Sequence, residues 1–254
     1  MFDCHAHYDD RAFDSDRDTL MHELFANGVS GIVNSGCDLE SSRASLELAH
    51  RFDGVYASVG VHPCGADSLH DGWTDELEAL MRDEKAVAIG EIGLDYYHED
   101  YAPREKQMGV FDTQLSLAQK IGARVVIHDR EAHADCISMT LAHKGLIGMF
   151  HCFSGSLETA KLLLDAGWYI SVGGVLTYKN ARVLPEVVAY VPFDRLLTET
   201  DCPYLTPVPN RGKRNRSDYI TYVLQKIAEI KGVSFDEAER ITEQNARDFY
   251  RLRA

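Results

Sequence analysis

The chain begins with the strand-like stretch Phe2-Asp3-Cys4-His5-Ala6-His7. Successive side chains of a β-strand point to opposite faces, so two histidines one residue apart lie on the same side of the strand. The chain has 11 histidines in 254 residues, and such a pair is common by chance, so its meaning depends on the rest of the sequence. The later apolar runs supply that context, because several of them also end in histidine or carboxylate residues.

Apolar, β-branched runs alternate with amphipathic stretches along the whole chain. We expect strands at 2–7, 29–34, 55–61, 86–92, 124–128, 146–153, 168–172 and 196–201. We expect helices near 15–27, 39–51, 74–83, 103–121, 131–143, 156–166, 179–189, 215–231 and 234–252. Apolar strands separated by helices are typical of a parallel sheet covered on both faces. No glycine-rich phosphate motif follows the first strand, so the pattern favours an α/β fold of the (β/α)8 TIM barrel class, with residues 1–254 as one domain.

The composition excludes several classes of protein. The formal net charge is −14 and the pI is near 5.2, which argues against a basic protein that coats nucleic acid. The sequence contains no apolar run of roughly 18 residues and no signal-peptide pattern at its start, so we expect a cytoplasmic protein without a membrane span. None of the six cysteines forms a Cys-x-x-Cys pair, and we expect reduced thiols.

Residues of the kind that bind metals occur at the ends of the apolar runs. They are His5 and His7 in the first run, His62 after the third, Glu91 in the fourth, His128 in the fifth, His151 in the sixth, and Glu199 with Asp201 in the eighth. In an α/β barrel the active site lies at the C-terminal ends of the strands. Histidines and carboxylates that converge there suit one or two divalent ions. A single histidine at a strand end is more often simply hydrogen-bonded, so this prediction depends on the number and order of these residues.

The longest irregular segment, residues 202–216, is rich in arginine. Barrels often bind phosphate near the loops after their last strands, so Arg211 and Arg214 are candidates for binding a substrate phosphate. The alternative is a solvated loop whose charges offset neighbouring acids. His62 and Arg130 are further candidates for contact with the substrate.

Taken together, these motifs resemble the TatD family of metal-dependent deoxyribonucleases, within the amidohydrolase superfamily. The resemblance covers essentially the whole chain. The segments that carry it are residues 3–7, 60–63, 90–96, 104–107 together with Phe111 and Gln114-Leu115, 126–128, 151–155, 198–205 and 211–215. One departure lies at His62-Pro63-Cys64, where the family often has His-Pro-His, and a thiol is a poorer hydrogen-bonding partner for phosphate than an imidazole.

The resemblance implies a binuclear metal site. Its ligands would be His5, His7 and Asp201 for one ion and His128 with His151 for the other, with Glu91 bridging both. Mg²⁺ or Mn²⁺ would be the working ions, and Zn²⁺ is also compatible with such ligands. Two ions at such a site generate hydroxide from water near neutral pH. We assign the acceptance of the water proton to Asp201, while Glu199 either shares that role or orients a ligand.

The activity implied is a 3′-to-5′ exonuclease that acts on single-stranded DNA or frayed ends, with a role in DNA repair or degradation. We expect DNA as the substrate and no obligate protein partner. The main alternative is a small-molecule amidohydrolase that cleaves an ester, lactone or amide at the same metal site. An ester hydrolase acting on aminoacyl-tRNA and a metal-stabilised binding scaffold without catalysis are two further alternatives.

Overall fold

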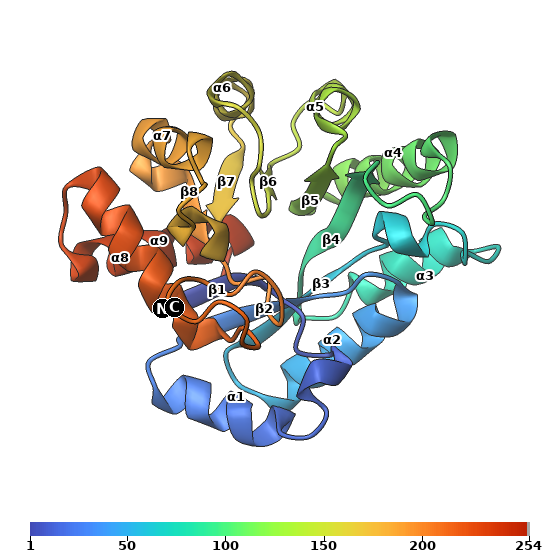
Figure 1. Cartoon of the computed structure of the whole chain (residues 1–254). Helices are drawn as coiled ribbons and strands as arrows, with labels where there is room; N and C mark the ends of the chain where they lie inside the picture. The colour runs from blue at the N-terminus through green and yellow to red at the C-terminus, as the bar shows by residue number, and fades with distance from the viewer. Residues whose placement is uncertain (253–254) are drawn as a thin grey trace. The chain divides into compact units, whose positions relative to one another are not determined.

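The computed structural model describes residues 1–252, in which strands and helices alternate along the chain (Figure 1). The strands are β1 (Phe2–Ala6), β2 (Gly31–Ser35), β3 (Val55–Val59), β4 (Ala86–Asp95), β5 (Val125–Arg130), β6 (Gly148–Phe150), β7 (Tyr169–Val172) and β8 (Leu196–Thr198). The α-helices are α1 (Arg17–Ala26), α2 (Leu39–Arg51), α3 (Trp73–Leu80), α4 (Arg104–Ile121), α5 (His133–Ala142), α6 (Leu157–Asp165), α7 (Val183–Tyr190), α8 (Ile220–Lys231) and α9 (Phe235–Tyr250).

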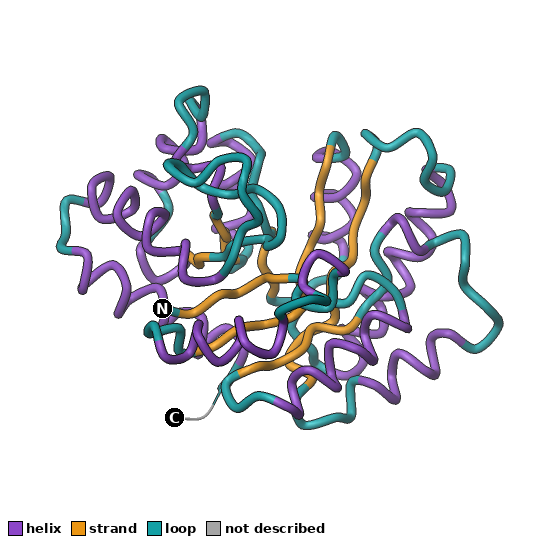
Figure 2. The backbone as a smooth tube through the Cα atoms, turned by 60° about the horizontal axis from the view of Figure 1, so that its bottom comes forward, coloured by secondary structure: helices purple, strands orange, loops and turns teal. Residues whose placement is uncertain are grey.

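The sheet has the topology expected of the predicted (β/α)8 class. Its strands follow one another in the order β1 to β8, and the pairs described between neighbouring strands are parallel. Every predicted strand and helix is present, and the fold class is confirmed. Figure 2 shows the same alternation, with orange strand segments separated by purple helices along the tube.

The strand ends differ from the prediction at two functional positions. β4 does not end after Ile92 but continues to Asp95, because its pairing with β5 resumes after an irregularity between Ile89 and Ile92. β8 ends at Thr198, three residues before Asp201, whose φ of +57° is incompatible with an extended strand. The prediction that each candidate ligand ends its own strand is therefore wrong for Glu91, which lies inside β4, and for Asp201.

The described residues group into two compact units. One comprises residues 1–34 together with those from His151 onward, and the other comprises residues 35–150. In the first unit, β1 pairs with β2 and β7 with β8, and the ring of Phe2 stacks on that of Tyr250 with 6.4 Å between ring centres. In the second, β3, β4, β5 and β6 pair in series, helix α4 packs on β4, and the α4 residues Phe111 and Leu115 are fully buried. That residues 1–254 form one domain stays a prediction.

Local sequence signals account for several helix ends. Gly122 ends α4 with a φ of +68°, in the left-handed region that glycine adopts without steric cost. The Ser234 hydroxyl accepts a hydrogen bond from the backbone N–H of Glu237 at the start of α9. All six cysteines are free thiols. None of the helices described here combines the length and apolar character that a membrane crossing demands.

Asp3 ties the start of β1 to two later segments of the first unit. Its fully buried carboxylate accepts hydrogen bonds from the backbone N–H and the hydroxyl of Thr200, at 2.9 and 2.5 Å, and from the hydroxyl of Ser217 at 2.6 Å. Burial raises the pKa of Asp3 from 3.8 to about 7, because these bonds offset only part of the desolvation.

This shift predicts a pH-dependent stability. In the folded protein Asp3 keeps its proton up to about pH 7, whereas in the unfolded chain it loses the proton near 3.8. The folded state thus binds more protons in this window, and the contribution of Asp3 to stability falls as pH rises, by about 1.4 kcal/mol per unit of pKa difference. Urea unfolding in EDTA is expected to give a difference between wild type and Asp3→Asn that declines from about pH 4 to about pH 7. The exposed variant Asp14→Asn is the control, and a difference independent of pH would mean that Asp3 is ionised throughout.

Candidate functional site: two clusters of histidines and carboxylates

The first unit contains a cluster formed by His5, His7, His151 and Asp201, which we call cluster 1. The Nε2 atoms of His5 and His7 are 3.0 Å apart, which confirms that the two rings lie on the same side of the strand. They lie 3.6 and 3.4 Å from Oδ1 of Asp201. The ring of His151 stacks on that of His5 with 4.0 Å between centres. Burial alone raises the pKa of Asp201, but the hydrogen bond from His7 and the charges of the three histidines bring it below its usual value.

The backbone brings these residues together. The N–H of Asp201 donates to the carbonyl of His5 at 3.0 Å, and the N–H of His7 donates to the carbonyl of Cys202 at 2.8 Å. The buried Asn215 side chain donates to the carbonyls of Thr200 and Tyr204, at 2.9 and 2.7 Å, and so fixes the turn that carries Asp201. Part of the loop after β8 is therefore a structural brace.

Glu199 lies next to His151 of cluster 1. The residue is fully buried, and its two carboxylate oxygens accept hydrogen bonds from the backbone N–H of Cys152 and the hydroxyl of Ser171, both at 2.5 Å. One of these oxygens lies 3.5 Å from Nδ1 of His151. This arrangement favours an orienting role for Glu199 over the acceptance of a proton from water, because both of its oxygens are held by fixed donors.

The second unit contains cluster 2, formed by His62, Glu91 and His128. Oε1 of Glu91 lies 2.7 Å from Nδ1 of His128 and 3.7 Å from Nε2 of His62. The rings of His62 and His128 are 4.3 Å apart between centres. Glu91 is only 4% exposed, and a carboxylate so deeply buried requires a cationic or hydrogen-bonding partner.

Asp95, at the end of β4, orients His128. Oδ2 of Asp95 lies 3.1 Å from Nε2 of His128 and 2.8 Å from Nδ1 of His98, while Oδ1 accepts the backbone N–H groups of Tyr97 and His98. Burial opposes ionisation, but these histidine hydrogen bonds bring the pKa of Asp95 below its usual value. Nδ1 of His128, on the side of Glu91, therefore either donates a proton to that carboxylate or, when Nε2–H donates to Asp95 as in carboxylate–histidine–metal units, would offer its lone pair to an ion held with Glu91.

Gly93 brings β4 close to His128. Its φ is +150°, and a Cβ atom built there would lie 1.9 Å from the carbonyl oxygen of His128. Any side chain at this position would collide with the backbone of β5, so glycine is required where the strand passes the histidine.

His62 has the opposite tautomer to His128. The backbone N–H of Cys64 donates to Nδ1 of His62 at 3.1 Å, so a neutral imidazole carries its hydrogen on Nε2. The nitrogen directed at cluster 2 is therefore a hydrogen-bond donor rather than a lone pair for a metal. The assignment of His62 to substrate binding stays a prediction.

Two buried glutamines of α4 brace cluster 2 from behind. Gln107 accepts from the N–H of Asp95 and donates to its carbonyl, each at 2.9 Å. Gln114 does the same for Val61, next to His62, at 2.8 and 2.9 Å. Each side-chain amide thus takes the place of a neighbouring strand and satisfies backbone groups that would otherwise be buried without partners.

The three candidate arginines have different environments. Arg214 makes a two-pronged ion pair with Asp16, at 2.8 and 2.6 Å, and donates to the carbonyl of Ala12. By contrast, the guanidinium groups of Arg130 and Arg211 stack on the rings of Tyr97 and Tyr178, 4.1 and 3.9 Å from the ring centres. Within residues 1–252 neither of these two arginines forms an ion pair with a carboxylate. Their positive charges are therefore not neutralised by the protein and can attract an anionic ligand.

The donor groups of both clusters fit a divalent ion. The ligand atoms of His5, His151 and Asp201 lie within 4.8 Å of one another, and those of Glu91 and His128 lie within 4.8 Å of each other and of the Nε2–H donor of His62. Mixed imidazole and carboxylate ligands suit Zn²⁺, Mn²⁺ or Fe²⁺ intrinsically. His151 stacks on His5 in the structure, whereas the family resemblance assigns it to the same ion as His128. Which ion His151 serves stays a prediction.

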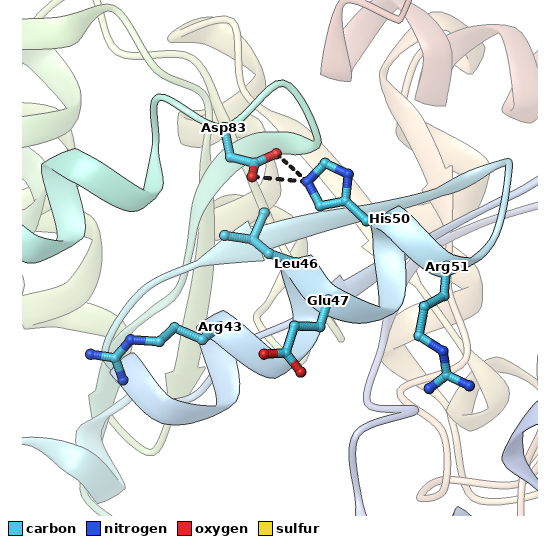
Figure 3. Close-up of a pocket in the computed structure, with 6 residues that line it drawn as sticks. All are labelled: Arg43, Leu46, Glu47, His50, Arg51 and Asp83. Carbon is cyan, nitrogen blue, oxygen red and sulfur yellow. Dashed lines mark hydrogen bonds and ion pairs between the residues drawn. The ribbon is translucent and has the colours of Figure 1, made fainter.

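A surface pocket of about 520 Å³ lies elsewhere in the second unit (Figure 3). It is lined by Arg43, Leu46, Glu47, His50, Arg51 and Asp83. Its histidine, His50, is held by both carboxylate oxygens of Asp83, at 3.0 and 2.9 Å. Asp83 precedes β4, so this pocket lies at the N-terminal end of that strand, opposite to the end at which barrel enzymes carry their active sites.

This chain is similar to known proteins of one family over almost its whole length. The family model described as TatD-related DNase matches residues 2–251. The uncharacterized metal-dependent hydrolase YabD of Bacillus subtilis is 40% identical over 99% of both chains. The 3′-5′ ssDNA/RNA exonuclease TatD of Salmonella typhimurium is 30% identical, again over 99% of both chains. The crystal structure of the TatD homolog YjjV from Escherichia coli superposes with a TM-score of 0.92, at 30% identity, over 100% of this chain and 98% of that one.

Asp95, Gln107, Gln114 and Asn215 are the site residues that the sequence did not identify. Each lies inside a motif that resembles the family, but its partner is a backbone group or a ring that only the fold brings near. One signal was present, since Gln107 and Gln114 share the apolar face of α4 with Phe111, where a polar side chain needs a buried partner.

Asp95→Asn tests the orienting role of this carboxylate. With its oxygen held by the backbone N–H groups, the asparagine would direct NH₂ at Nε2 of His128 and favour the tautomer that has no lone pair on Nδ1. We expect the affinity of cluster 2 for Mn²⁺ or Zn²⁺ to fall roughly 10- to 100-fold, measured by competition with a chelating dye. Asp135→Asn, which removes a carboxylate bonded to the hydroxyl of Tyr96, is the matched control. Unchanged affinity in Asp95→Asn would mean that other groups fix His128.

Proposed function

Because the chain belongs to the TatD family of metal-dependent hydrolases, we propose that it hydrolyses phosphodiester bonds as a 3′-to-5′ exonuclease on single-stranded DNA or frayed ends. One observation carries the proposal. Each unit has a cluster of side chains that could hold a metal ion, and a buried carboxylate lies next to one histidine of that cluster. Asp95 lies next to His128, and Glu199 lies next to His151. Such an arrangement costs folding energy unless the histidines serve a ligand.

The residues divide the chemistry between them. A divalent ion held by each cluster would supply Lewis acidity, lower the pKa of a bound water and neutralise charge on the phosphate. Asp201, ionised and in contact with His7, is the group to which we assign acceptance of the proton from the attacking water. Nε2–H of His62 would donate a hydrogen bond to a phosphate oxygen. The bridging role of Glu91 stays a prediction.

The choice of an anionic substrate is supported by the arginines without acidic partners. The chain has 40 acidic and 26 basic residues, and Arg130 and Arg211 nevertheless form no ion pair with a carboxylate within residues 1–252. Arg130 follows His128 by two residues, and Arg211 lies in the segment that Asn215 braces. A guanidinium group can donate two parallel hydrogen bonds to two oxygens of one phosphate. The Salmonella relative named as a 3′-5′ ssDNA/RNA exonuclease supports the same class of substrate.

Digestion of single-stranded DNA labelled at either terminus tests the proposal. With Mg²⁺ or Mn²⁺ we expect a 5′-labelled strand to shorten progressively, a 3′-labelled strand to release its label at once as a mononucleotide, and EDTA to abolish both reactions. Glu91→Ala is expected to reduce turnover at least 100-fold, on the order of what loss of a group acting at the reacting centre costs. Glu47→Ala, an exposed carboxylate in the pocket of α2, should stay fully active.

The outcomes separate the alternatives. Metal-loaded protein that leaves DNA intact but cleaves small esters, lactones or amides would overturn the nuclease and support an amidohydrolase. DNA cleavage that persists unchanged in Glu91→Ala would come from a contaminating enzyme.

A further inference from the structure

A stacked pair of side chains lies at the C-terminal ends of β4 and β5. Arg130 is the last residue of β5, and the register pairs it with Asp95, the last residue of β4. Tyr97 lies two residues after Asp95 in the sequence. The Arg130 guanidinium lies over the ring of Tyr97, 4.1 Å from the ring centre. The pair therefore joins two adjacent strand ends in the second unit.

The exposure and charge of the pair distinguish it from ordinary packing. Tyr97 is 56% exposed, the highest value among the large hydrophobic and aromatic side chains of the described chain, although Arg130 covers one face of its ring. Arg130 is itself exposed, and within residues 1–252 it makes no ion pair with a carboxylate. The exposed ring face of Tyr97 is apolar and interacts poorly with water. The guanidinium of Arg130 beside it is positively charged and attracts anions.

The pair is attached to cluster 2 through Asp95. Oδ1 of Asp95 accepts the backbone N–H of Tyr97 at 2.9 Å, while Oδ2 lies 3.1 Å from Nε2 of His128. The same carboxylate thus fixes the orientation of His128 and the position of Tyr97. A ligand seated on Tyr97 would be held at a defined place relative to cluster 2.

We propose that Tyr97 and Arg130 form a nucleotide subsite, in which the tyrosine ring stacks on a nucleobase and the guanidinium binds the adjacent phosphate. The inference rests on the proposed function and names a binding subsite for its substrate. Stacking on an aromatic ring accepts every base, because each base has a π-face, and it suits an enzyme that shortens strands regardless of sequence. The guanidinium, 4.1 Å from the ring centre and without an ion pair to a carboxylate within residues 1–252, has N–H groups that can bind phosphate oxygens.

Binding to two matched strands separates the roles of the two side chains. The probes are a dye-labelled single-stranded oligothymidylate with phosphorothioate linkages, which resist hydrolysis, and the same strand with abasic sugars in place of its thymidines. Affinity is measured by fluorescence anisotropy with Mg²⁺ present. Tyr97→Ala is expected to weaken binding of the oligothymidylate roughly 5- to 100-fold and to change binding of the abasic strand less than about twofold. Tyr97→Phe should bind both strands like wild type.

Arg130→Gln is expected to weaken both strands and to reduce the slope of log affinity against log salt by about 0.7, the value for one phosphate contact on a single strand. The control is Tyr190→Ala, since Tyr190 is 49% exposed and has a cation over its ring, Lys161 at 5.1 Å, but precedes β8 rather than following it. Circular dichroism and metal content confirm that each variant is folded.

The result that overturns the subsite is a Tyr97→Ala protein that binds the oligothymidylate as tightly as Tyr190→Ala, or that loses equal affinity for both strands. A wild-type protein that binds neither strand would also overturn it. Failure of the proposed function is distinguishable, because a protein that binds the bases through Tyr97 but cleaves no DNA would retain the subsite without the nuclease.

Discussion

A histidine that binds a metal ion through one ring nitrogen carries a hydrogen on the other nitrogen, which almost always donates to an acceptor, and buried carboxylates lie next to two of the histidines in this chain. Asp95 accepts the hydrogen of His128, and Glu199 lies next to His151. Both carboxylates are almost completely buried, and both are held by fixed donors of the backbone or of Ser171. Their position determines which atoms of the clusters are lone pairs and which are donors, and the chemistry that we propose depends on that distinction.

Side-chain amides hold the segments around both clusters in place by hydrogen bonding to backbone groups. Gln107 and Gln114 hydrogen-bond both the N–H and the carbonyl of a strand-end residue, and Asn215 braces the turn around Asp201. Strand ends are normally the places where backbone groups lose their partners and become mobile. A site built from such ends needs replacement partners, and in this protein α4 and the loop after β8 provide them.

The sequence predicted the eight strands, the helices between them and the fold class, because hydrophobic runs and their spacing report burial directly. It did not predict where strands end near the clusters. β4 continues past Glu91 because pairing with β5 resumes at Ile92, and β8 stops early because the chain turns sharply at Asp201. Such boundaries depend on the hydrogen bonds of the neighbouring strand, which a single sequence does not contain. The same limit applies to Arg214, whose partner Asp16 lies 198 residues away.

The chemistry of both clusters requires that each of them binds one divalent ion. Mn²⁺ titration of protein stripped with EDTA, followed by electron paramagnetic resonance of the free ion, measures the number bound per chain. We expect two ions per chain in the wild type, and one ion fewer when Asp201→Ala and His5→Ala are combined to remove cluster 1. A wild-type chain that binds one ion, or none, would mean that the two clusters are not separate metal sites.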